Sequence, residues 1–93
     1  MDLTLADILA ARKAIAGKVV RTPLLPSRFL SEKTGIPFHL KMETMQPTGA
    51  FKLRGATNAV LALSPENRAR GVTAASTGNH GRALAHAARL AGA

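Results

Sequence analysis

One local pattern occurs twice in this chain, and it constrains the fold more than any other feature. Residues 38–42 alternate apolar and polar side chains, as a strand does, and a Thr-Gly turn and a helical spacing over 50–63 follow. The short apolar run 72–75 is likewise followed by a Thr-Gly turn and an alanine-rich helical stretch over 80–90. This order of strand and helix predicts an α/β fold built from βαβ units, with parallel neighbouring strands and a right-handed crossover.

Local signals predict the remaining elements. Thr4 and Asp7 are spaced as at a helix start, and the apolar stripe behind them predicts a helix over 4–16. Residues 18–26 contain two valines and two prolines, which predicts an extended segment. Two further short helices are expected, each from a serine cap to a glycine, over 27–35 and 64–71.

The length of the chain limits it to one compact unit. It has 93 residues, and only three of them are aromatic, so a light core of Ala, Leu, Val and Ile is expected. Two parallel strands do not form a stable sheet alone, and parallel sheets need covering on both faces. We therefore expect residues 1–93 to be the N-terminal part of a larger α/β protein. A complete small domain is the alternative.

Composition excludes several classes of protein. Without cysteine, the chain has no disulfide scaffold, thiol nucleophile or thiolate zinc site. No secretory signal or membrane-spanning run is recognisable, so a soluble cytoplasmic protein is expected. The formal net charge is +8, but the 13 Lys and Arg residues are spread along the chain. Neither nucleic acid nor membrane is therefore an expected partner, and a small basic binding module is the non-enzymatic alternative.

The two Thr-Gly turns carry the residues with chemical potential. In an open parallel sheet such turns lie at the carboxyl ends of adjacent strands, which would place Lys52 and Asn79 at one crevice. The partial positive charge of a helix start favours the neutral amine of a lysine, and a neutral lysine can form a Schiff base with an aldehyde. A solvated, charged Lys52 is the alternative from the spacing alone.

The residues around these turns resemble a known family. The stretch ETMQPTGAFKLRGA, residues 43–56, resembles the pyridoxal-phosphate lysine motif of the serine/threonine dehydratases, which are fold type II enzymes related to tryptophan synthase β. The stretch STGNHG, residues 76–81, is similar to the second loop of that family, and RTPL at 21–24 is similar to its N-terminal segment. Within the family, the sequence of residues 46–60 looks most like that of the hydroxyectoine-utilisation dehydratases.

This resemblance implies a function and roles for single residues. It implies a pyridoxal-phosphate-dependent ammonia-lyase that eliminates water from threonine, serine or a hydroxyectoine-derived substrate and yields a keto acid and ammonia. Lys52 would hold the cofactor as a Schiff base and act as the base at the α-carbon, Phe51 would lie against the cofactor, and Asn79 would bind its ring hydroxyl. The substrate carboxylate would be held by the loop residues Ser76, Thr77, Gly78 and His80.

The resemblance also leaves alternatives open. Thr77 stands where serine racemases carry a second acid or base, so a racemase of the same fold is the alternative enzyme. Glu43 is either a catalytic acid or a carboxylate that orders the following loop.

The family's glycine-rich phosphate cradle lies beyond residue 93, so this segment alone is expected to be inactive. The full-length form is expected to be a homo-oligomer, a dimer or a tetramer. The three histidines lack the spacing of metal ligands, so no metal site is expected.

Overall fold

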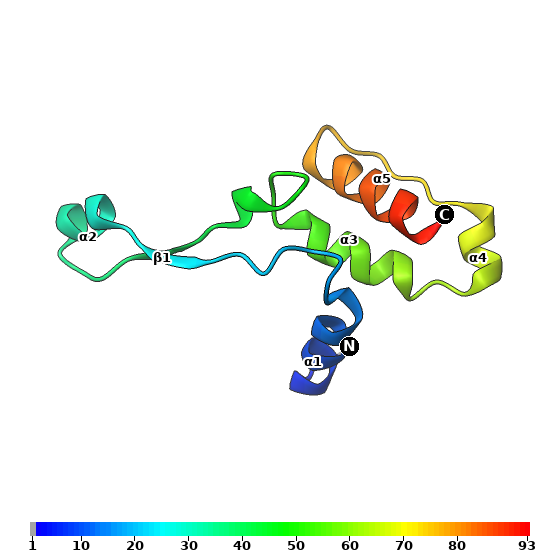
Figure 1. Cartoon of the computed structure of the whole chain (residues 1–93), viewed down its shortest axis with the longest axis horizontal. Helices are drawn as coiled ribbons and strands as arrows, with labels where there is room; N and C mark the ends of the chain where they lie inside the picture. Colours follow the sequence, from blue (N-terminus) through cyan, green and yellow to red (C-terminus); the bar gives the residue numbers. More distant parts are fainter. Residues whose placement is uncertain (1) are drawn as a thin grey trace.

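The chain adopts an elongated shape with three parts. A computed structural model describes residues 2–93 and measures 53 × 31 × 26 Å, with a radius of gyration of 16.0 Å. A compact chain of this length would have a radius of gyration of about 12 Å. Figure 1 shows a pair of helices on one side, a thin arm extending away from it, and an N-terminal helix that projects from their junction. Much apolar surface therefore stays exposed within this chain, including Leu24, Phe29 and Phe51.

The N-terminal helix begins where its capping residues predict. Helix α1 spans Leu5–Ile15, and Thr4 precedes it as the N-cap. The backbone amide of Thr4 donates to Asp7 Oδ2 at 2.8 Å, and the amide of Asp7 donates to Thr4 Oγ1 at 3.3 Å. The hydrogen bond from the Thr4 hydroxyl lowers the pKa of Asp7. This reciprocal pair satisfies two amides that the helix cannot pair internally, so the expected helix over 4–16 is confirmed.

The arm contains two short strands and a short helix. Strand β1 spans Leu24–Pro26, helix α2 spans Arg28–Thr34 and strand β2 spans His39–Lys41. The Ser27 side chain caps α2, and Gly35 ends it in the left-handed conformation at φ 75°, as the serine and glycine predict. The strands pair antiparallel, with Leu24 opposite Lys41 and Pro26 opposite His39.

The packed core lies between two helices. The 3₁₀ turn η1, Glu43–Met45, leads to helix α3, Lys52–Leu61; helix α4, Pro65–Arg70, then leads to helix α5, Asn79–Ala91. Helices α3 and α5 pack side by side and run in the same direction (Figure 1). Leu53 and Ala83 are 0 % exposed at their contact. The core is as light as the composition predicts, and its buried members are Leu53, Ala56, Val60, Ala83 and Ala87.

The mixed helix and strand content is confirmed, but the expected strand pairing is wrong. The strand expected over 38–42 exists as β2, yet its partner is the antiparallel β1, and 72–75 form no strand within residues 2–93. β1 lies 13 to 17 positions before β2 in its register, so this pairing closes a shorter loop than pairing with 72–75 would. The arm also points away from α3 and α5, which keeps β2 apart from 72–75 (Figure 1).

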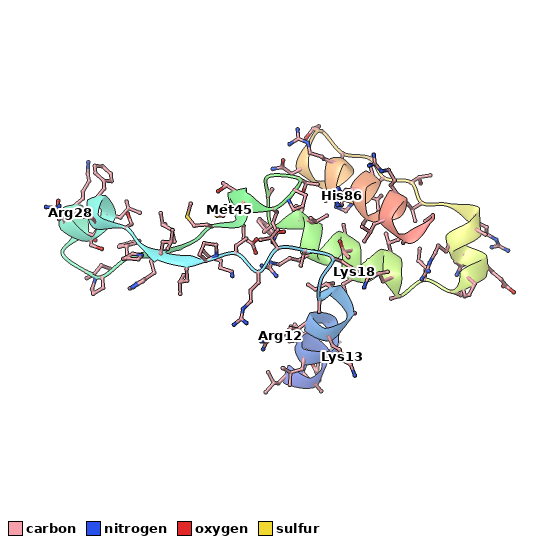
Figure 2. All side chains as sticks on the ribbon, in the orientation of Figure 1. Arg12, Lys13, Lys18, Arg28, Met45 and His86 are labelled. Atoms are coloured by element: carbon pink, nitrogen blue, oxygen red, sulfur yellow. The ribbon has the colours of Figure 1, made fainter. Side chains whose placement is uncertain are left out.

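The basic side chains are spread over the molecule, as their spread along the sequence predicts (Figure 2). Figure 2 shows Arg12 and Lys13 on α1 and Arg28 on α2, in separate parts of the molecule. Arg28 forms an exposed ion pair with Glu32, with Nε and Oε1 2.7 Å apart. Across residues 2–93, no helix combines the length and the apolar character needed to cross a membrane.

Candidate functional site

Lys52 lies at the exposed start of α3. The preceding loop turns at Gly49, where φ is 75°, and the Gly49 amide donates to the Gln46 carbonyl at 2.8 Å. Phe51 occupies the N-cap position and is 63 % exposed, and Lys52 is the first helical residue. The Lys52 Nζ atom lies 5.8 Å from the centre of the Phe51 ring. An amine and an aromatic face are thus presented together at a helix N-terminus.

The second loop is organised by one serine hydroxyl. Ser76 Oγ accepts hydrogen bonds from the amide of Gly78 at 3.2 Å and from the amide of Gly81 at 2.9 Å. Glycine at position 81 avoids a tight contact, because a Cβ atom there would lie 3.2 Å from the Ser76 Cβ atom. Asn79 and His80 are the first two residues of α5, and both are exposed. Their amides have no partner within the helix, so they are available to an anion.

The two loops meet at the same end of the helix pair. Because α3 and α5 are parallel neighbours, both helices start at the end of the pair that faces the arm (Figure 1). The Arg82 side chain, in the first turn of α5, reaches across, and its Nη1 atom lies 3.5 Å from the Thr48 carbonyl oxygen. The predicted site residues Phe51, Lys52, Ser76, Thr77, Gly78, Asn79 and His80 are therefore all contributed by these two adjoining helix starts.

This arrangement fits a cofactor with an aldehyde, an aromatic ring and a phenolic oxygen. Lys52 offers the primary amine that an aldehyde requires, and Phe51 offers an exposed aromatic face beside it. Asn79 offers an amide that can donate to a ring oxygen. The chemistry of this donor set is that expected for pyridoxal phosphate.

Glu43 is bound in a manner that decides between its two expected roles. Its Oε1 atom accepts from Arg54 Nε, and its Oε2 atom accepts from Gln46 Nε2 at 2.7 Å. Burial by itself would raise the pKa of Glu43, but the hydrogen bonds from Arg54 and Gln46 and the charges of Arg54 and Lys41 together lower it. A carboxylate held ionised is a poor acid at neutral pH, so the arrangement favours the role of ordering the loop.

Sequence reasoning missed three residues that shape this region. Gln46 and Arg54 lie within the recognised motif but were given no role, and Arg82 was expected only as one of the dispersed charges. Arg82 also lines a hollow of about 350 Å³ on the side of α5, together with Thr48 and the half-buried His86. Figure 2 shows His86 on α5, the helix to which the sequence assigns it. Nowhere in residues 2–93 do three His, Asp or Glu side chains gather as a metal site would require.

Comparison with known proteins gives consistent matches. A family model described as "Pyridoxal-phosphate dependent enzyme" matches residues 15–93. The L-threonine ammonia-lyase of Thermotoga maritima is 50 % identical over 90 residues, 97 % of this chain and 22 % of that protein. The L-threo-3-hydroxyaspartate ammonia-lyase of Saccharomyces cerevisiae is 47 % identical over 87 residues, 94 % of this chain and 27 % of that protein.

A solved structure has the same backbone arrangement. The serine racemase of Dictyostelium discoideum superposes with a TM-score of 0.90 at 40 % identity, covering 96 % of this chain and 29 % of that one. The chain thus spans about a quarter of the length of the proteins that it matches.

Two glycines in the first turns of α3 and α5 test the geometry of the second loop. Gly55→Ala meets no atom within 4 Å, so it should stabilise the 93-residue chain by about 0.5–1 kcal/mol through helix propensity. Gly81→Ala gains the same propensity but presses on Ser76, so its net effect should be at least about 0.5 kcal/mol less favourable. Urea unfolding of both variants measures the difference. Equal gains at the two positions would contradict the close approach of Gly81 and Ser76.

Proposed function

This chain belongs to the family of pyridoxal-phosphate dependent enzymes, and from this we propose that residues 1–93 form the N-terminal part of the cofactor-binding catalytic domain of a hydroxy-amino-acid ammonia-lyase. The substrate class is threonine, serine or a hydroxyectoine-derived amino acid, and the products are a keto acid and ammonia. The main support is the pairing of two helix starts that present Lys52 with Phe51 on one side and Asn79 on the other. The names of the Thermotoga and yeast relatives support the same reaction class.

Three residues would hold the cofactor. Pyridoxal phosphate supplies a carbonyl that combines with amines and a ring that accepts electron density from a substrate's α-carbon. Lys52 Nζ would bind the carbonyl carbon covalently, and Phe51 would pack against the ring edge. The Asn79 side-chain amide would donate to the ring oxygen and fix the orientation of the ring. Each of these groups is exposed at the shared end of α3 and α5.

Lys52 would also move the proton of the reaction. With its amine free when substrate is bound, Lys52 would accept the proton from the substrate α-carbon. The β-hydroxyl of the substrate would then take up this proton from Lys52 and leave as water, and the released enamine would react with water to give the keto acid and ammonia.

The start of α5 would bind the substrate carboxylate. Ser76 Oγ already accepts from two backbone amides, so its own proton remains available to donate to an anion. Thr77 adds a second hydroxyl, Gly78 allows the close approach of backbone, and His80 adds a ring donor beside the free amides of the helix. These are neutral or weakly basic donors, which suits reversible binding of a carboxylate.

A racemase of the same fold is a second candidate, and it is favoured by Thr77 together with the similarity to a serine racemase. In that case the Thr77 hydroxyl would exchange a proton on the face of the substrate opposite to Lys52.

We further propose that the complete protein acts as a homo-oligomer in the cytoplasm. It would need the remainder of its domain, with the phosphate cradle, for activity.

Removing the Lys52 amine should abolish cofactor attachment. In the complete enzyme, Lys52→Ala should remove the absorbance of the bound cofactor and lower the elimination rate by about 10² to 10⁴-fold or more, because the covalent anchor and the base are both lost. Lys33→Ala is the matched control, since Lys33 Nζ also lies over a phenylalanine ring, that of Phe29 at 5.6 Å. A coloured and active Lys52→Ala enzyme would refute the proposed role.

Thr77→Ala distinguishes the lyase from the racemase. If Thr77 binds the carboxylate, the substitution should raise KM for elimination by about tenfold and leave kcat almost unchanged, because one hydrogen bond is lost in substrate and transition state alike. Rates of elimination and racemisation on L- and D-serine measure both activities. Racemisation by the wild type that disappears in Thr77→Ala, while elimination survives, would establish the racemase instead.

A further inference from the structure

The loop that carries Lys52 is held by a partly buried polar cluster made of Glu43, Gln46 and Arg54. Gln46 is 3 % exposed, and its side-chain amide pairs with the backbone of Val20 in both directions. Val20 N donates to Gln46 Oε1 at 2.9 Å, and Gln46 Nε2 donates to the Val20 carbonyl at 2.8 Å. These bonds join residues 26 positions apart, so they fix the loop to the segment that follows α1.

Arg54 closes the cluster from the other side of Lys52. Its Nε atom donates to Glu43 Oε1, and its Nη2 atom donates to the Val20 carbonyl at 3.2 Å. The side chains of Glu43 and Arg54 are 18 % and 32 % exposed, whereas those of the surface pair Arg28 and Glu32 are 91 % and 65 % exposed. A shielded pair with further hydrogen bonds on both partners has far more influence on local structure than an exposed pair.

The residues of the cluster flank Lys52 in the sequence. Glu43 and Gln46 precede the turn at Gly49, and Arg54 lies one helical position beyond Leu53, so Lys52 lies between the two sides of the cluster. Leu53 is fully buried against α5. Lys52 is therefore flanked in the sequence by residues held in polar bonds and is adjacent to the packed Leu53, while its own side chain is exposed.

From this geometry we infer that Glu43, Gln46 and Arg54 are positioning residues that set the direction in which α3 presents Lys52 to the cofactor. This inference rests on the proposed function, because it assigns the cluster to the orientation of the amine that binds pyridoxal phosphate. The cluster touches neither substrate nor cofactor in this role. Its effect is to keep the Lys52 amine at one place relative to the start of α5, where Asn79 lies.

The test compares Glu43→Gln with Glu32→Gln in the complete enzyme. Glutamine at position 43 retains one acceptor oxygen but places an amide donor against either Arg54 or Gln46, which are themselves donors. The same change at Glu32 affects only the exposed pair with Arg28. Trapping with borohydride after mixing apoenzyme with pyridoxal phosphate gives the rate of covalent attachment to Lys52. Glu43→Gln should lower this rate and kcat by about tenfold or more, with KM little changed, and Glu32→Gln should change none of them.

Two further measurements separate positioning from general destabilisation. Hydrogen exchange at the Val20 amide, which donates to Gln46, should accelerate at least about tenfold in Glu43→Gln, while the amides of α5 remain protected. The double variant Glu43→Gln/Arg54→Gln should be no slower in attachment than Glu43→Gln alone, because the two residues act as one unit.

Each outcome has a distinct meaning. If the wild type never attaches the cofactor at Lys52, the proposed function fails, and exchange at Val20 still reports on the cluster. If Glu43→Gln accelerates exchange at Val20 but attaches the cofactor at the wild-type rate, the positioning role is refuted. A fall in attachment that matches only a general loss of folded protein, seen as equal acceleration throughout α5, would also refute it.

Discussion

The close packing of α3 against α5 is the contact on which the rest of the arrangement depends. Leu53 and Ala83 are fully buried where the helices meet, and Ala56, Val60 and Ala87 belong to the same buried cluster. Alanines on α5 let the two helices approach closely, and their parallel direction brings both N-termini to one end (Figure 1). The chemistry proposed for Lys52 and Asn79 depends on this packing, because it brings two helix starts that are 27 positions apart in the sequence to the same end of the pair.

Polar contacts then fix the shapes of the two loops that precede α3 and α5. Ser76 shapes the second loop through the amides of Gly78 and Gly81, and Gln46 ties the first loop to Val20. Both side chains act on backbone groups, which lack partners wherever a helix begins or a loop turns. Lys52, Thr77 and Asn79 remain exposed beside these loops.

Local signals predicted the helices, and contacts between distant residues were the part that sequence could not supply. Thr4 with Asp7, Ser27 and Gly35 act within a few positions, so the helices that they bound are found where expected. Strand pairing is a long-range choice that periodicity does not specify, and β2 pairs with β1, which is nearer in the sequence, rather than with 72–75. For the site, both helix starts were predicted, but the bond between Gln46 and Val20 joins positions that no local pattern connects.

The central claim is that Lys52 is the residue that binds pyridoxal phosphate, and mapping of the reduced complex tests it directly. The complete enzyme is treated with pyridoxal phosphate and borohydride, digested with trypsin and analysed by mass spectrometry. Modification at Lys52 should block cleavage there and give a peptide covering residues 42–54 that carries the mass of the reduced cofactor. Modification at Lys41 or Lys33 with Lys52 unmodified would contradict the account.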